Sequence, residues 1–128
     1  MNNKTAHNDY AKVYIEQDIL HFIYLPIVNL SLDMAKKLVR LRISVQNNKS
    51  YPVLCDLREV IQADKSAMDY LAKEGSELAT AVALLVKYPH SAFTADFYLQ
   101  TSLPAVPTRL FEDPLKAKEF LSNYPKRH

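Results

Sequence analysis

The hydrophobic positions near the N-terminus alternate with polar ones. Residues 10–17 place alanine, valine and isoleucine on one face and lysine, tyrosine and glutamate on the other, which predicts a half-buried strand. Residues 19–25 form a second, more apolar run, and Gln17-Asp18 between the two runs suits a tight hairpin turn. Pro26 ends the second run because proline has no N–H to donate to a sheet. This part of the chain therefore predicts an antiparallel hairpin.

Further along the chain, helical spacing alternates with short apolar runs. Apolar residues recur at helical intervals in four segments, which predicts helices over residues 32–46, 64–75, 91–101 and 113–124. Unbroken apolar runs predict buried strands at residues 53–57 and 80–87, and a short last strand follows at 109–111. This order predicts an α/β fold with a mixed, mainly parallel sheet of about five strands, the hairpin at its edge and about four helices.

Residues at the ends of the predicted helices support these boundaries. Ser31 suits the N-cap of the first helix, and Asp113-Pro114 combines a capping side chain with proline at the first helical position. Asp64 or its neighbour is expected to cap the second helix. Gly75, the only glycine in the chain, is expected just past the end of that helix with a positive φ.

Two of the helices carry large apolar residues that suggest how they pack. Phe93 and Phe97 lie one turn apart and are predicted to point into the core. If they are exposed instead, they mark a subunit or partner interface, where aromatic residues are enriched. Leu115, Phe120 and Leu121 are predicted to anchor the last helix.

Length and composition fit a single soluble domain. We expect one domain over residues 1–128, with its core at about 10–124. The 16 basic and 14 acidic residues give a net charge of +2, which is too balanced to indicate nucleic-acid binding. No apolar run is long enough to cross a membrane, and residues 1–4 carry no apolar signal segment. Together with a single cysteine, these features predict a cytoplasmic protein.

Several kinds of catalytic or cofactor site are excluded by the residues present. Dinucleotide-binding loops and P-loops need more than one glycine, because their backbone has to approach phosphates closely, and Gly75 alone supplies neither. The four histidines show no metal-ligand spacing. Cys55 lies within a buried run and is expected to be inert, and capping explains Ser91 beside His90. We therefore predict no catalytic residue, no metal and no cofactor.

Five polar residues form the candidate binding site. Asp64, Lys65 and Ser66 open the second predicted helix, whose unpaired N–H groups and positive dipole end attract anions. Asp56 and Arg58 follow the buried strand before it, and ligands of open α/β sheets bind past the ends of strands. The simpler alternative is that Asp64 only caps the helix, Lys65 is solvated, and Asp56 and Arg58 only hold a loop.

Three segments resemble the SpoIIAA-like proteins, a group with the STAS-like fold of anti-sigma-factor antagonists, and more closely an uncharacterised bacterial subgroup. The segments are Val53-Leu54-Cys55-Asp56-Leu57-Arg58, Ala81-Val82-Ala83-Leu84-Leu85-Val86 and Pro107-Thr108-Arg109-Leu110-Phe111-Glu112-Asp113. The resemblance covers roughly residues 10–124 and consists mostly of core strands, so it implies a fold more than a function.

The resemblance also bears on regulation by phosphorylation. In the antagonist family the second helix opens with Asp-Ser-Ser/Thr-Gly, and a kinase phosphorylates the first serine. The matching residues here are Asp64-Lys65-Ser66-Ala67, so Lys65 replaces that serine and alanine replaces the glycine. The resemblance therefore implies a degenerate phospho-switch.

Two functions remain open at this point. The first is a non-enzymatic regulatory module that acts through a protein partner or through self-association, with a homodimer as the default state. The second is a domain that binds a small apolar or anionic metabolite at the strand ends near the start of the second helix. An enzyme without a recognisable motif is the least supported alternative.

Overall fold

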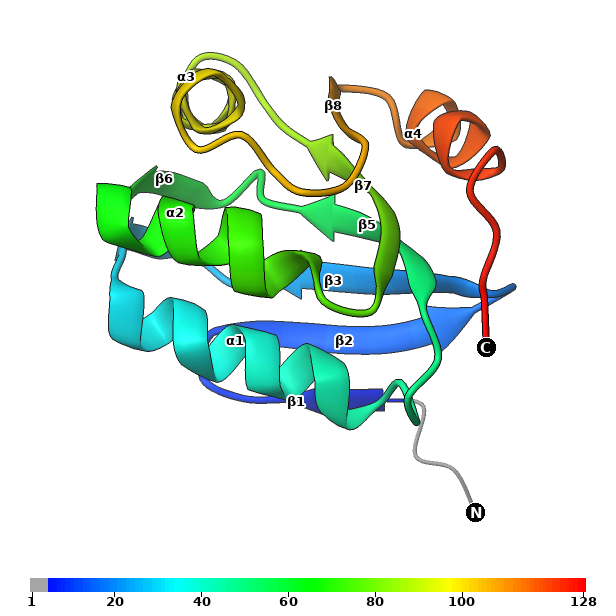
Figure 1. Ribbon diagram of the computed structural model, residues 1–128. Helices are drawn as coiled ribbons and strands as arrows, with labels where there is room; N and C mark the ends of the chain where they lie inside the picture. The colour runs from blue at the N-terminus through cyan, green and yellow to red at the C-terminus, as the bar shows by residue number, and fades with distance from the viewer. Residues whose placement is uncertain (1–4) are drawn as a thin grey trace.

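Six strands form the main sheet of the computed structural model, which describes residues 5–128 (Figure 1). In spatial order they are β1 (Thr5–His7), β2 (Ala11–Glu16), β3 (Ile19–Tyr24), β5 (Tyr51–Asp56), β7 (Ala79–Leu85) and β8 (Thr108–Phe111). β1 to β3 pair antiparallel, and the remaining neighbours pair parallel. The mixed α/β fold is confirmed, and its main sheet has one strand more than the five or so predicted. The segment 1–4, on which the signal-peptide prediction depends, lies outside the described residues.

The predicted hairpin turn is present and forms without glycine. Gln17 and Asp18 have φ values of 53° and 60°, so both central residues take the left-handed conformation that a two-residue hairpin of the primed type requires. The flanking strands pair in register, with Glu16 opposite Ile19. The sequence prediction of β2, β3 and their connection is confirmed.

Two further strands form a small separate sheet that the sequence did not reveal. β4 (Ile27–Leu30) and β6 (Val60–Ala63) pair parallel and continue β3 and β5 beyond a break. On the β3 side the break is Pro26, which has no N–H, and pairing resumes where the Ile27 amide donates to the Glu59 carbonyl at 3.1 Å. The result is a two-stranded extension of the β3–β5 pair.

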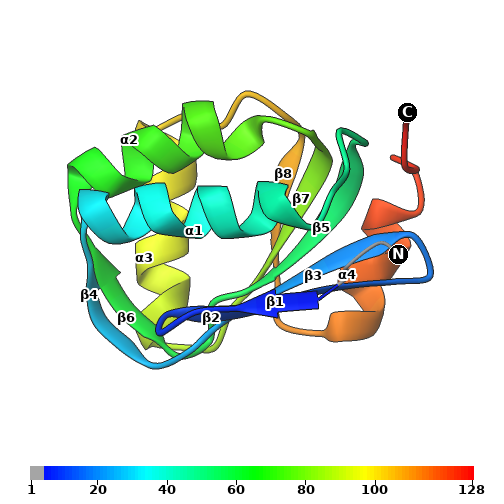
Figure 2. The same cartoon turned by 90° about the horizontal axis from the view of Figure 1, so that it is seen from below.

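Four α-helices cover the two faces of the main sheet. α1 (Leu32–Ser44) and α2 (Lys65–Lys73) lie side by side on one face, and α4 (Pro114–Leu121) lies on the other (Figure 2). α3 (His90–Thr101) packs over β6 and β8. Two predicted caps are confirmed, because Ser31 Oγ accepts from the Met34 amide at 3.3 Å and Asp113 Oδ1 from the Leu115 amide at 2.9 Å.

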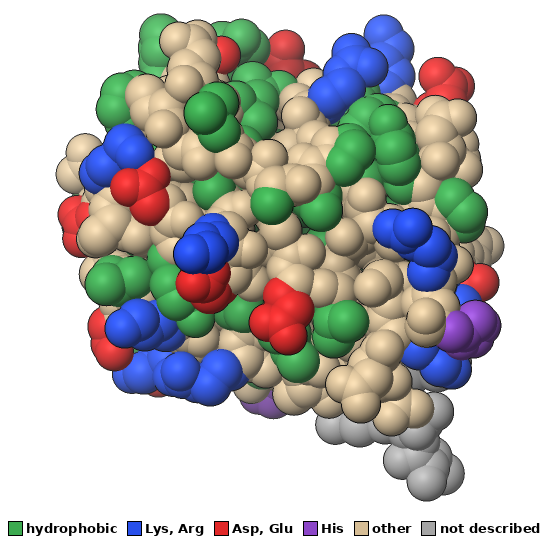
Figure 3. All heavy atoms as spheres, viewed as in Figure 1, with side chains coloured by type: hydrophobic (Ala, Val, Ile, Leu, Met, Phe, Trp, Pro, Cys, Tyr) green, Lys and Arg blue, Asp and Glu red, His purple; other side chains and the backbone are tan. Residues whose placement is uncertain are grey.

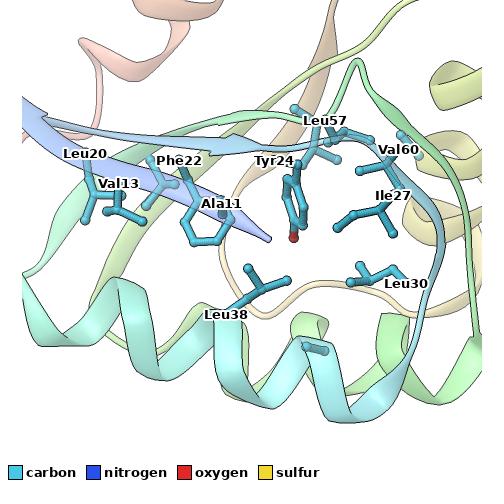
Figure 4. Close-up of a cluster of buried hydrophobic side chains, with 14 of the residues drawn as sticks. Ala11, Val13, Leu20, Phe22, Tyr24, Ile27, Leu30, Leu38, Leu57 and Val60 are labelled. Atoms are coloured by element: carbon cyan, nitrogen blue, oxygen red, sulfur yellow. The ribbon is translucent and has the colours of Figure 1, made fainter. Parts of the chain in front are cut away.

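Each face of the sheet has its own hydrophobic core. The larger core lies between the sheet and α1 to α3 (Figure 4) and includes Ala11, Val13, Leu20, Phe22 and Leu38. The smaller core, under α4, contains Leu54, Ala81, Ala83, Leu85, Ala117 and Leu121. β5 and β7 contribute to both cores, which confirms that they are covered on both faces.

Leu115 does not anchor α4, contrary to the sequence prediction. Its side chain is 76% exposed, whereas Ala117 and Leu121 are buried. Ala117 and Leu121 are four residues apart and share one face of the helix, and Leu115 falls outside that face. The small Ala117 lets the helix axis approach β7 closely.

Gly75 also differs from its predicted role. α2 continues into a 3₁₀ turn, η1 (Glu74–Ser76), and Gly75 lies inside this turn without a positive φ. The left-handed residue is Leu78, with φ of 56°. Because α2 passes into the 3₁₀ turn before the chain reverses, the residue with positive φ is three positions after Gly75, the predicted position.

Since Gly75 has an ordinary backbone conformation, alanine should replace it without strain. An added Cβ would lie 3.4 Å from the nearest Leu71 side-chain atoms, which is normal van der Waals contact. We expect Gly75→Ala to raise the free energy of unfolding by about 0.5 kcal/mol, because alanine restricts the unfolded chain. Urea titration measures this change. A loss of stability would show that the site needs the freedom of glycine after all.

Candidate functional site

Asp56 and Arg58 form a bidentate ion pair at the end of β5. Arg58 Nε and Nη2 donate to the two carboxylate oxygens of Asp56 at 3.0 and 2.8 Å, and the Arg58 amide donates to Oδ1 at 3.2 Å. Hydrogen bonding to the carboxylate raises the pKa of Arg58. The surrounding surface depression also contains Glu59 and Lys87, so its charges are mixed. The pair holds the turn before β6, as the simpler interpretation proposed.

Asp64, Lys65 and Ser66 lie at the start of α2, as predicted. Asp64 has the N-cap backbone conformation, but its side chain makes no capping hydrogen bond and instead accepts from Asn29 Nδ2 at 3.0 Å. Lys65 forms an ion pair with Asp69 one turn later, and Ser66 is exposed. The sequence predicts Asp64 or its neighbour as the cap of α2: Asp64 does occupy the N-cap position, but the expected side-chain capping bond is absent. The bond to Asn29 holds β4 against the start of the helix instead.

The two groups of candidate residues do not form one pocket. β6 separates the Asp56–Arg58 pair from the start of α2, and four strand residues span about 13 Å. Among the described residues, no hydrogen bond or ion pair joins Asp56 or Arg58 to Asp64, Lys65 or Ser66. A role of these five residues in binding stays a prediction.

α3 exposes both of its phenylalanines and buries both of its alanines, whereas its largest side chain, Tyr98, is half-buried. Phe93 and Phe97 are 70% and 49% exposed, whereas Ala92 and Ala95 are buried. Hydrophobic side chains accordingly gather on the surface at the position of α3 (Figure 3). The prediction that both phenylalanines point into the core is wrong. α3 packs on β6, and its inward-facing positions carry the two alanines together with the half-buried Tyr98 and Leu99.

The exposed apolar surface continues from α3 onto β6. Thr94 Oγ1 donates to the Ile61 carbonyl at 2.8 Å, which fixes β6 alongside the helix. Ile61 is itself half exposed. We call Phe93, Phe97 and Ile61 together the apolar α3 surface. The sequence contained the signal for it, since the helical spacing of the two phenylalanines suits an interface as well as a core.

A cavity of about 110 Å³ lies inside the larger core, between the sheet and helices α1 to α3, and is partly open to solvent. Most of its lining is apolar and comes from side chains such as Phe22, Leu38, Val53, Met68 and Leu84. Residues with polar side chains also line it: Tyr24, Arg42, Cys55, Ser76, Thr94, Tyr98 and Thr108. Sequence reasoning missed this cavity because its lining comes from segments spread over most of the chain.

The two nucleophilic side chains considered from the sequence, Cys55 and Ser91, are not available for reaction. Burial raises the pKa of the Cys55 thiol to about 12, so the thiolate is absent at neutral pH. Ser91 is fully buried, and its hydroxyl donates to the Lys87 carbonyl and accepts from the Lys87 amide. No three His, Cys, Asp or Glu side chains of residues 5–128 gather as a metal site would require.

Comparison with known families gives one match over most of the chain. Residues 13–125 match DUF7793, described as a domain of unknown function. The chain belongs to DUF7793. No curated protein matches it. Within the part of the chain that the structure describes, no helix of this DUF7793 domain is both long and apolar enough to cross a membrane.

Among solved structures, the DUF7793 domain is similar to an uncharacterised protein of the DUF3478 family from Shewanella loihica PV-4, which has a SpoIIAA-like fold. The TM-score is 0.60 at 16% sequence identity, over 91% of this chain and 98% of the other. The predicted SpoIIAA-like fold is thereby confirmed. At this identity the likeness concerns the fold alone.

Proposed function

We propose that this DUF7793 domain is a non-enzymatic interaction module that binds a second copy of itself through the apolar α3 surface. The observation that carries the proposal is the inverted packing of α3, which exposes Phe93 and Phe97 and buries alanines. Exposed aromatic residues that cluster on one helix are typical of interface centres. We expect the protein, and therefore this self-association, in the cytoplasm.

The apolar α3 surface suits pairing with itself. Phe93 and Phe97 lie symmetrically about Ala95, which is next to the middle of the helix His90–Thr101. A two-fold axis at this point places Phe93 of one copy against Phe97 of the other, and the reverse, as an isologous interface requires. Asp96 is the only acidic residue in α3, and Gln100 Nε2 donates to it at 2.9 Å. This hydrogen bond leaves the charge of Asp96 in place, so pairing in this geometry requires the two Asp96 carboxylates to stay solvated and not to face each other.

The non-enzymatic part of the proposal rests on the state of the polar side chains. The carboxylate of Asp56 is bonded to Arg58, and the Ser91 hydroxyl is bonded to the backbone of Lys87. The Cys55 thiol stays protonated because burial raises its pKa. None of these groups offers a free base or an activated nucleophile.

Any regulatory role would act through association rather than through phosphorylation of α2. Lys65 stands where the related antagonists carry their phosphorylated serine, and it pairs with Asp69 within the same helix. Lysine has no hydroxyl group to phosphorylate, and at this position it forms an i, i+4 ion pair on the helix surface instead. Mass spectrometry of purified protein that shows phosphate on Ser66 would contradict this part of the proposal.

The double variant Phe93→Ser, Phe97→Ser tests the proposed interface. We expect the unmodified protein to be a dimer at about 100 μM in light-scattering chromatography, and the variant to dissociate with a Kd raised at least about tenfold, because aromatic residues at an interface centre contribute most of its binding energy. Leu115→Ser is the matched control, since Leu115 is equally exposed but lies on α4. A monomeric unmodified protein, or a variant that stays dimeric, would overturn the proposal.

A further inference from the structure

Arg42 is a buried cation that forms no ion pair with any described residue, although the Glu77 charge acts on it from more than 4.0 Å away. Its side chain lies on the inner face of α1, one turn after Leu38, and is only 4% exposed. Among residues 5–128, no carboxylate oxygen lies within 4.0 Å of its nitrogens. Burial lowers its pKa to about 10, so the guanidinium remains charged at neutral pH. A buried charge of this kind is costly unless an anion or several acceptors compensate it.

Part of the guanidinium has a structural role, and part of it is free. Nη2 donates to the carbonyls of Gly75 and Glu77 at 3.0 and 2.8 Å, and Nη1 donates to Gln46 Oε1. Since arginine has five N–H donors, two remain, namely Nε–H and one hydrogen on Nη1. Neither donates to any residue that the structure describes, and Arg42 lines the cavity.

Tyr24 brings a second free donor to the same cavity. It is 7% exposed and lines the cavity, and it reaches from β3 toward α1 with its hydroxyl directed at the helix face that carries Leu38 (Figure 4). Its hydroxyl makes no hydrogen bond within residues 5–128. Burial raises the pKa of Tyr24, so the hydroxyl keeps its proton and stays a donor. Within the described residues every fully buried side-chain N or O atom has a hydrogen-bond partner, so the unpaired Tyr24 hydroxyl is solvent-accessible, as the partly open cavity allows.

We infer that the cavity binds a small monocarboxylic acid, whose carboxylate accepts from Arg42 and Tyr24 and whose apolar body lies against the Phe22, Leu38 and Val53 side chains. The two free N–H groups of Arg42 and the hydroxyl of Tyr24 supply donors for both carboxylate oxygens. The bound anion would also compensate the buried guanidinium. This ligand site is independent of the apolar α3 surface.

The size and charge of the cavity select this ligand class. An enclosed apolar cavity of about 150 Å³ holds benzene. This cavity is smaller, at about 110 Å³, but it is partly open to solvent, so a single small ring or a short branched chain fits with one end at the opening, whereas a long fatty acid is too large. A phosphate carries up to two negative charges and would need more than one buried cation. Among the cavity-lining side chains, Arg42 is the only cationic one. A monocarboxylate matches this charge.

Benzoate is a suitable probe, with benzyl alcohol as its neutral counterpart and acetate as the control for added salt. We expect benzoate to bind with a Kd on the order of 0.1–1 mM in calorimetric titration, which is typical of so small a ligand. At about 10 mM it should raise the Tm by several degrees. Benzyl alcohol is expected to bind at least about tenfold more weakly, because it leaves the guanidinium uncompensated.

Two variants locate the site without removing Arg42, on which the fold depends. Tyr24→Phe removes one donor and should weaken benzoate binding about tenfold. Ala95→Leu fills the cavity from α3, and it should abolish binding while leaving the unliganded protein folded. Phe93→Ala on the outer face of the same helix is the control and should leave the affinity unchanged. Absence of benzoate binding, equal binding of benzyl alcohol, or full binding to Ala95→Leu would each overturn the inference.

Discussion

Arg42→Met is expected to lower the free energy of unfolding by about 3 kcal/mol, although Arg42 belongs to no ion pair. The substitution keeps most of the side-chain volume but leaves the carbonyls of Gly75 and Glu77 and the Gln46 side chain without their donors. Each buried acceptor left unpaired costs about 1–3 kcal/mol, and removal of a desolvated charge offsets part of the sum. Urea titration followed by circular dichroism measures the change.

Arg58→Met is the control for this prediction. Arg58 forms the best ion-pair geometry in the described chain, with two hydrogen bonds to Asp56, but its side chain is 44% exposed. Exposed pairs contribute less than about 1 kcal/mol, so this variant should be nearly as stable as the unmodified protein. If both arginine variants lost the same stability, the buried acceptors would not be the reason for the effect of Arg42→Met.

Leu121→Ala is expected to cost about 3 kcal/mol. Leu121 is 1% exposed and, apart from Ala117, is the one fully buried side chain that α4 adds to the smaller core. Its removal leaves a cavity that the neighbouring alanines of β7 are too small to fill, and cavities of this kind give losses of about 2.7–5 kcal/mol. Thermal and urea unfolding measure the loss.

Leu115→Ala serves as the matched substitution on the same helix. Leu115 is 76% exposed, so its truncation should change the free energy of unfolding by no more than about 0.5 kcal/mol. Leu121→Ala and Leu115→Ala make the same chemical change in one helix, the first in the core and the second at the surface. A similar loss in both variants would mean that helix propensity, rather than packing on β7, sets the stability of α4.

The elements that could be predicted from the sequence are those with a local signal. Alternation before Gln17-Asp18 gave the hairpin, and the capping residues Ser31 and Asp113 gave the starts of two helices. The unbroken apolar character of β5 and β7 indicated burial on both faces, and both cores contain residues of these strands. Each of these signals depends on residues that are neighbours in sequence.

The elements that could not be predicted depend on contacts between distant segments. β4 and β6 have four residues each, too few for a periodic pattern, and each is stabilised by pairing with the other. Periodicity placed Phe93 and Phe97 on one face of α3, but it does not say which face is turned inward. Nothing in the sequence marks Arg42 as buried, because the carbonyls that hold it lie more than 30 residues away.

The candidate site shows the same limit. The start of α2 was placed correctly, but its partners were not, because Asn29 lies 35 residues before Asp64. The cavity had no sequence signal, because side chains such as Phe22, Leu84 and Tyr98 meet there only through the folded sheet and helices.

The two outer strands of the main sheet limit how copies of this domain can join. β1 has three residues and β8 has four, so each outer edge of the main sheet is short (Figure 1). Short edges hinder the addition of a foreign strand, which is the usual route to continuous sheets and fibrils. Assembly by extending the sheet is thereby disfavoured. Copies are instead expected to associate through side chains such as those of the apolar α3 surface, which form a closed dimer. The protein is accordingly expected to stay dispersed at high concentration instead of growing into open aggregates.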